Sequence, residues 1–126
     1  MDDRLAPLIG EWTVKASLSD DLGKATFEWI LGGHFVVQRL EIAHPDAPDS
    51  FAILGPDEDG YVQHYFDSRG VARRYEMTLE GNRWTLERDH PGFAQRWTAT
   101  IGDDTIHGTW ELNGTKDFDT TYTRDR

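Results

Sequence analysis

The sequence predicts an all-β protein that folds as a closed, antiparallel, up-and-down barrel of about ten strands. Apolar and polar residues alternate along short segments, and turn signals separate these segments about every 8 to 12 residues. No segment has the length and periodicity of a long helix. Many short, half-apolar strands leave unpaired edges that a closed barrel removes, so the barrel is favoured, and a two-sheet sandwich is the alternative.

Ten segments carry the strand pattern, and turn-forming residues separate them. Asn113-Gly114 gives the strongest hairpin signal in the chain, Gly70 in the turn DSRG is free to take a positive φ, and the prolines of HPDAPD (44–49) mark a loop. The N-terminal stretch DDRLAPLIG is expected to form a short helical turn over one end of the barrel. The expected strands are residues 11–19, 24–31, 32–42, 50–54, 61–67, 71–79, 83–89, 93–101, 105–112 and 117–123.

Composition excludes several classes of function. The chain has 126 residues, enough for one domain spanning 1–126. It has no cysteine, which excludes disulfides, thiolate catalysis and Cys-ligated zinc. A net charge of −10, from 23 acidic and 13 basic residues, argues against nucleic acid as a partner. Neither a signal peptide nor a membrane span is recognisable, so a cytoplasmic protein without a membrane partner is expected.

The segment GGHFVVQRLEI (32–42) raises the question of function. Alternation puts Val36 and Leu40 on the core side together with His34 and Gln38, while the charged residues fall on the other side. Buried polar side chains are costly unless they find partners. They either pair with one another or lie at the barrel ends, or they line a pocket.

The same parity argument extends to the other strands. The expected apolar inner residues are Trp12, Val14, Leu18, Phe27, Trp29, Leu31, Val36, Leu40, Ile42, Met77, Leu79, Trp84, Leu86, Phe93, Trp97, Ile101, Ile106, Trp110, Leu112 and Phe118. The expected polar inner residues are His34, Gln38, Arg73, Tyr75, Arg88, Gln95, Thr120 and Tyr122. Strand 61–67 is ambiguous, because Tyr61, Gln63 and Tyr65 compete with Val62, His64 and Phe66.

So many polar groups on one wall favour a cavity for a small, partly apolar and anionic molecule over a solid core. The fifteen aromatic residues, five of them tryptophan, suit the lining of such a site. The predicted ligand-binding residues are His34, Gln38, Tyr65, Arg73, Tyr75, Arg88, Gln95, Trp97 and Tyr122.

Several stretches carry a resemblance to known proteins. LIGEWTV opens the first strand with Gly10-Glu11-Trp12, and the last strand ends with TYTR, which contains Arg124. A G-x-W opening with a late arginine resembles the calycin superfamily, in which the Trp closes the barrel base and the Arg stacks on it. With GGHF, YFDSRG and the Trp-rich second half, the whole chain resembles the bacterial lipocalin-like proteins grouped as the DUF1579 family. That resemblance implies the fold and assigns no activity.

Two better-known calycin groups suggest ligands. Fatty-acid-binding proteins hold a carboxylate with interior Arg and Tyr, but they carry Arg-x-Tyr on the last strand and a helical lid; this chain has Tyr122-Thr123-Arg124 and no room for that lid. The resemblance therefore implies a smaller acid or an aromatic molecule. Nitrobindins bind haem through a His on the last strand, where this chain has KDFDTTYT. Haem would need His34, His64 or His107 instead, and no cofactor is expected.

No catalytic motif is present, and no catalytic residue is assigned. There is no G-x-S-x-G, H-E-x-x-H or glycine-rich phosphate loop, and no His-x-His pair that predicts a metal site. An isomerase, cyclase or lyase with His34 as general base is one alternative to a binding protein. A protein without a pocket, acting through its surface, is another, and Ile30, Phe35 and Val37 on the expected outer face suggest a homodimer patch.

Overall fold

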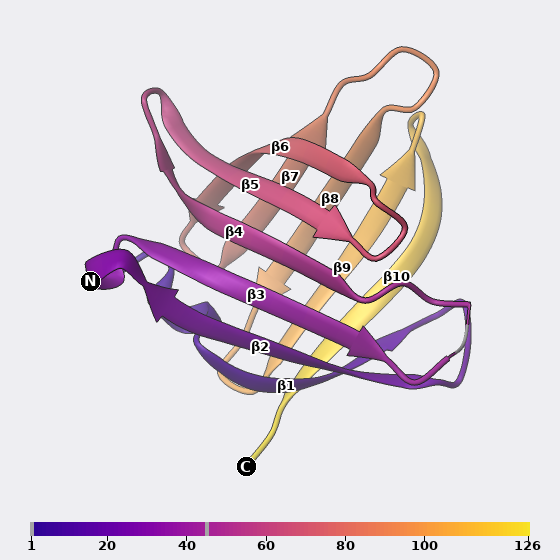
Figure 1. Cartoon of the computed structure of the whole chain (residues 1–126), viewed down its shortest axis with the longest axis horizontal. Coiled ribbons are helices and arrows are strands. Elements are labelled where there is room, and N and C mark those ends of the chain that lie inside the picture. The colour runs from indigo at the N-terminus through magenta and orange to yellow at the C-terminus, as the bar shows by residue number, and fades with distance from the viewer. Residues whose placement is uncertain (1, 45) are drawn as a thin grey trace.

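The computed structural model describes residues 2–44 and 46–126, and it shows a closed, ten-stranded antiparallel barrel (Figure 1). Each strand pairs with the next along the chain, and the last strand pairs with the first, so the prediction of an all-β barrel is confirmed and the sandwich is wrong. The strands are β1 (Gly10–Ala16), β2 (Leu22–Ile30), β3 (Phe35–Ile42), β4 (Ser50–Asp57), β5 (Gly60–Asp67), β6 (Ala72–Glu80), β7 (Arg83–Arg88), β8 (Gln95–Ile101), β9 (Thr105–Leu112) and β10 (Thr115–Arg124).

The up-and-down order sorts the connections between strands into two ends of the barrel. The loops β1–β2, β3–β4, β5–β6, β7–β8 and β9–β10 lie along the top and right of Figure 1, and we call this end the mouth. The other connections lie at the opposite end, along the left and bottom of the view, and the N-terminus lies at the left. The turn of the β9–β10 hairpin has Asn113 at φ 52° and Gly114 at φ 81°, as the Asn-Gly signal predicts. Gly70, in the β5–β6 turn, has the expected positive φ of 86°.

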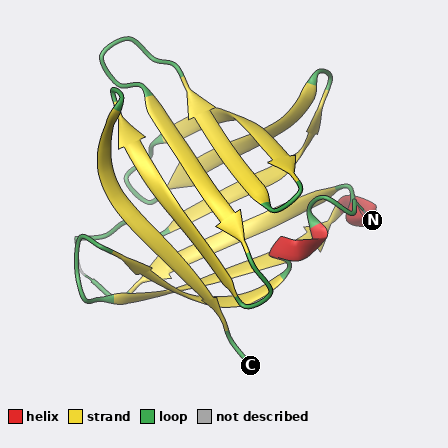
Figure 2. Cartoon of the chain, turned by 180° about the vertical axis from the view of Figure 1, so that it is seen from behind, coloured by secondary structure: helices red, strands yellow, loops and turns green. Residues whose placement is uncertain are grey.

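The N-terminal segment closes the end opposite the mouth. A short 3-10 turn, η1 (Ala6–Leu8), packs there with Leu5 and Leu8 fully buried, which confirms the expected helical turn (Figure 2). The indole of Trp12 donates a hydrogen bond from Nε1 to the carbonyl of Leu8 (2.9 Å). The guanidinium of Arg124 lies 4.1 Å from the centre of the Trp12 ring, so the expected cation–π contact is present.

Arg124 also ties the end of β10 to the N-terminal segment. Its guanidinium donates to the carbonyls of Ile9 (2.7 Å), Pro7 (3.0 Å) and Asp103 (3.1 Å). A Cβ on Gly10 would lie 2.7 Å from the Arg124 Nη1, so only glycine leaves room for this arrangement. The closed end is therefore held by one arginine that contacts three segments of the chain.

The inward parity predicted from alternation holds within the strands and fails beyond their ends. Trp12, Phe27, Leu86 and Ile106 are almost completely buried, as expected. Leu18 and Leu31, in contrast, are 67% and 71% exposed, so their predicted inward orientation is wrong. Leu18 lies two residues beyond Ala16, the last residue of β1, and Leu31 begins η2 (Leu31–Gly33), the 3-10 turn between β2 and β3. The predicted strands ran too far at both places.

The outer face of β3, β4 and β5 carries a small apolar cluster of its own. Val37 and Val62 face outward yet are only 2% and 6% exposed. Phe35 lies flat over Gly55, where a Cβ would come within 2.2 Å of its ring. Ile30 and Phe35 are half-buried, so the patch suggested for a homodimer is mostly covered by the chain itself. The homodimer remains a prediction.

Candidate functional site

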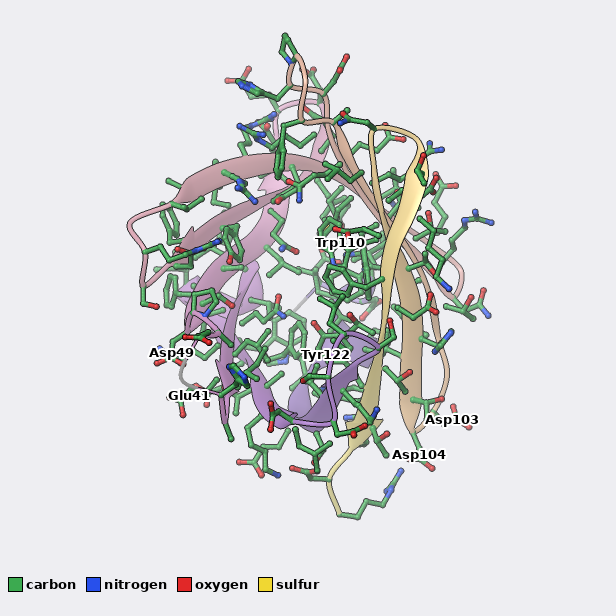
Figure 3. All side chains as sticks on the ribbon, turned by 90° about the vertical axis from the view of Figure 1, so that its right-hand side faces the viewer. Glu41, Asp49, Asp103, Asp104, Trp110 and Tyr122 are labelled. Atoms are coloured by element: carbon green, nitrogen blue, oxygen red, sulfur yellow. The ribbon has the colours of Figure 1, made fainter. Side chains whose placement is uncertain are left out.

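The mouth half of the barrel contains a cavity of about 640 Å³. Strands from every side of the barrel and three mouth loops contribute to its wall. Seven of the predicted ligand-binding residues line it: Gln38, Tyr65, Arg73, Tyr75, Gln95, Trp97 and Tyr122. Figure 3 views the molecule from the mouth side and shows Trp110 and Tyr122 inside, whereas Glu41, Asp49, Asp103 and Asp104 lie at the periphery.

The other two predicted residues do not line the cavity. His34 is exposed in the β2–β3 connection, at the end opposite the mouth, so its expected inward orientation is wrong. Gly32 and Gly33 have positive φ, and β3 begins only at Phe35, so strand parity does not apply to His34. Arg88 has the inward parity but is the last residue of β7, and it reaches the edge of the mouth rather than the cavity wall.

The structure shows which residues of β5 face the barrel interior, a choice that the sequence left open. Gln63 and Tyr65 line the cavity, and Tyr61 packs against the core. The register with β6 explains this choice: Tyr61 pairs with Met77, Gln63 with Tyr75 and Tyr65 with Arg73. Residues directly opposite in an antiparallel pair share a face, and β6 has one clear apolar inner row. The missed residue Gln63 could have been found by extending that row to its neighbour.

Aromatic side chains form one side of the cavity. The ring of Trp97 lies 5.6 Å from that of Trp84, edge to face, and 5.3 Å from that of Trp110. Trp110 in turn lies 5.7 Å from the ring of Tyr75. A Cβ on Gly108 would fall 2.3 Å from Trp97, so this glycine makes room for the indole. Such a wall offers large, rigid apolar contact area to a flat ligand.

Two hydrogen bonds satisfy part of the polar wall. Gln38 Nε2 donates to the hydroxyl of Tyr122 (3.3 Å), and the Tyr75 hydroxyl donates to Gln95 Oε1 (2.8 Å). Burial raises the pKa of Tyr122 to about 12, and burial also raises the pKa of Tyr75. Both phenols therefore stay protonated at neutral pH, so they can act as hydrogen-bonding groups and do not act as bases.

Three buried polar atoms of the cavity wall have no hydrogen-bond partner among the described residues. They are Gln63 Oε1 and the indole nitrogens of Trp84 and Trp97. The two indoles lie edge to face against other aromatic rings, a weakly favourable setting for an N–H group. Gln63, in contrast, is only 5% exposed, and its amide oxygen accepts no hydrogen bond from any described residue.

Two arginines next to Tyr75 have no acidic partner in the part of the chain that the structure describes. Arg73 and Arg88 both act on the Tyr75 phenol and oppose the rise of its pKa. Arg73 lies 4.9 Å from the centre of the Phe93 ring. Within residues 2–44 and 46–126, neither arginine forms a salt bridge, although eight other lysines and arginines do.

Arg69 at the β5–β6 turn behaves differently, because its charge is used within the chain. It pairs with Asp67 at 2.6 Å, and Tyr65 donates to the same carboxylate at 2.8 Å. The Arg69 side chain, followed by Tyr65 and backbone N–H groups, holds the pKa of Asp67 well below its ordinary value of 3.8. Burial and this bond to Asp67 raise the pKa of Tyr65 to about 12. The trio fixes the turn and the Tyr65 ring.

The rim of the cavity is acidic. Asp21, Asp46, Glu111 and Asp117 line it from the loops and strand ends at the mouth. Among the described residues, Asp21 is the one of these four acids whose carboxylate forms an ion pair, with His44 Nε2 at 3.8 Å. These four acids come from separate parts of the sequence, and their gathering at one opening depends on the barrel topology.

His44 lines the cavity from the β3–β4 loop at the mouth. His34, His64 and His107, which a haem iron would have needed, are exposed and lie outside the cavity lining. Among the described residues no group of three His, Asp or Glu side chains could hold a metal ion. The site is a partly polar cavity with an aromatic wall and with Arg73 toward its mouth.

Comparison with protein-family models and with curated protein sequences gives no match for this chain. Within the described residues no helix has the length and apolarity needed to cross a membrane. The fold and the cavity define the class, a closed antiparallel β-barrel with an internal site open at one end.

Proposed function

We propose that the protein binds a small, partly apolar, anionic molecule in the barrel cavity. Arg73 carries the proposal. It lines the cavity and has no carboxylate within 4.0 Å among the described residues, in a chain with ten more acidic than basic residues. A guanidinium left free of acids binds carboxylates and other oxyanions well, because its planar donors match two oxygens.

The surroundings of Arg73 support the same ligand class. Arg88 adds a second positive charge near Tyr75 at the mouth. The cavity volume of about 640 Å³ lies in the usual range for small-molecule sites, which are mostly apolar with a few polar anchors. The tryptophans supply the apolar part, and Arg73 supplies the anchor.

The acidic rim affects the rate at which the anionic ligand enters the cavity more than the stability of the bound complex. A negative rim lowers the concentration of anions at the mouth and slows association. Once inside, the ligand is close to Arg73, and the apolar wall excludes water around the pair. Tight binding with slow, salt-sensitive entry is therefore expected.

A binding role is favoured over proton transfer. The inward tyrosines have raised pKa values, and the suggested general base His34 lies at the far end of the barrel. The contact between Trp12 and Arg124 supports, as a further proposal, kinship with the lipocalin-like barrels.

The first experiment is a titration with 2-naphthoate and its neutral isostere naphthalene-2-carboxamide, followed by tryptophan fluorescence and calorimetry. The acid is expected to bind more tightly than the amide. Arg73→Gln should weaken the acid about 10- to 100-fold, the range for hydrogen bonds to a charged group, and leave the amide almost unchanged.

The matched control is Arg83→Gln, an exposed arginine at the closed end of β7. It should leave both affinities unchanged. Equal loss in both arginine variants, or equal binding of acid and amide, would contradict the proposal. Native against denaturing mass spectrometry of freshly purified protein would then give the mass of any ligand carried through purification.

A further inference from the structure

We propose that the ligand is a hydroxylated aromatic acid, and that the carboxamide of Gln63 binds its hydroxyl group. This inference rests on the proposed function, because it takes the anionic end of the ligand to lie at Arg73. It adds a second polar group to the ligand and assigns a specificity-determining residue to it.

The three glutamines of the cavity wall differ in one respect. Gln38 and Gln95 each hydrogen-bond to a tyrosine hydroxyl. Gln63 is as buried as Gln38, at 5% against 7% exposed, yet its Oε1 has no partner among the described residues. Two of the three glutamines thus have a hydrogen-bond partner in the cavity wall, whereas the amide oxygen of the third, Gln63, has none among the described residues.

The two residues directly opposite Gln63 do not supply the missing hydrogen bond. Across the sheet it pairs with Leu54 on β4 and with Tyr75 on β6. Leu54 has no polar side-chain atom, and Tyr75 already donates its hydroxyl hydrogen to Gln95. A buried amide oxygen without a hydrogen bond costs folding free energy, and a donor group that enters the cavity can offset this cost.

A hydroxyl group fits this position better than a second charge. It both donates and accepts, so it serves either atom of the amide, and the soft terminal torsion of glutamine lets either atom turn toward it. An ionised group would lack a counter-charge, because Arg73 lies nearer the mouth.

The register of β5 and β6 sets the spacing of the two polar groups. Tyr65 pairs with Arg73, so Gln63 is the diagonal neighbour of Arg73 on the inner face, roughly 7–8 Å away along the backbone. Gln63 is the deeper of the two, since β5 runs from the closed end to the mouth. A flat ring between acid and hydroxyl spans such a distance and can pack beside the tryptophans.

The test compares 6-hydroxy-2-naphthoate with 2-naphthoate by titration of the intact chain. In the wild type the hydroxy acid is expected to bind about three- to tenfold more tightly, the effect of one neutral hydrogen bond. In Gln63→Met the two acids should bind within twofold of each other, with 2-naphthoate retained. The control His64→Ala, whose exposed side chain lies on the outer face of the same strand, should keep the preference.

The outcomes separate the two proposals. Equal affinity of both acids in the wild type overturns the role of Gln63 and leaves the anion site standing. No binding of either acid overturns both. Should Gln63→Met fail to fold, 3-hydroxy-2-naphthoate decides on the wild type. Its hydroxyl lies beside the carboxylate, so it should gain nothing, and a gain equal to that of the 6-hydroxy isomer overturns the assignment.

Discussion

The substitution Gly108→Ala should destabilise the barrel by pushing Trp97 out of place. The added Cβ would lie 2.3, 2.5 and 2.7 Å from three carbons of the six-membered ring of Trp97. Carbon atoms pack at about 3.5–4.0 Å, so the ring must withdraw by roughly 1 Å or more. Gly108 has an ordinary strand backbone, and alanine itself causes no strain there.

The magnitude follows from what surrounds the indole. Trp84, Trp110 and Tyr122 hold the ring on three sides, at 5.6, 5.3 and 6.5 Å between ring centres. Overpacking of a held side chain costs about 1–3 kcal/mol. We expect a loss of about 2 kcal/mol in the free energy of unfolding, or a fall in Tm of roughly 8 °C for a chain of this size. The displaced ring also narrows the cavity, so 2-naphthoate should bind more weakly.

Urea unfolding followed by tryptophan fluorescence and circular dichroism measures this loss. A double-mutant cycle with Trp97→Phe isolates the contact, because phenylalanine lacks the three clashing carbons. In that background Gly108→Ala should cost less than about 0.5 kcal/mol. An equal cost in both backgrounds, or no cost in the wild type, would refute the reasoning.

Three further predictions concern the closed end, the β5–β6 turn and the mouth. Arg124→Ala should lower the free energy of unfolding, measured in urea, by about 2–4 kcal/mol, because three carbonyl hydrogen bonds and the Trp12 contact are lost. Arg124→Lys should recover only part of this stability, and wild-type stability of both variants would contradict the role of Arg124. Asp67→Asn should be less stable than the wild type at neutral pH. Since the folded pKa of Asp67 is lowered, its contribution is full above the ordinary value of 3.8 and fades as pH falls below it, so the two proteins should converge in acid; a constant difference would exclude this role. Stopped-flow association of 2-naphthoate should speed up with added salt, because salt screens the acidic rim, and a rate that falls with salt would show that the rim does not control entry.

Alternation and turn residues were enough to predict the barrel, because each strand buries one face and the turns are short. They could not predict where strands end. Two positive-φ glycines separate His34 from β2, and β3 begins only at Phe35, so the position of His34 in the alternating pattern carries no information about facing. The predicted inward facing of Leu18 and Leu31 was wrong because both residues also lie beyond the end of a strand.

The site was predictable only in part. The facing of Arg73 and Tyr75 followed from parity because the large apolar residues of β6 share one face, and that of Gln38 followed because the charged residues of β3 lie on the opposite face. In β5 both sets hold aromatic and polar residues, and only the register with β6 decides between them. Whether the interior is filled or hollow depends on summed side-chain volumes across ten strands, which no local pattern contains.

The seam between β1 and β10 sets the order of events during synthesis. Trp12 pairs with Arg124 across this seam, so the first strand made must wait for the last before the sheet can close. Until then β1 is an edge strand with unpaired backbone groups, and such edges recruit other chains. Contacts so distant in sequence also slow folding. A change that delays β10 therefore prolongs the lifetime of an open sheet, and it should reduce the yield of folded protein even where the finished barrel is stable.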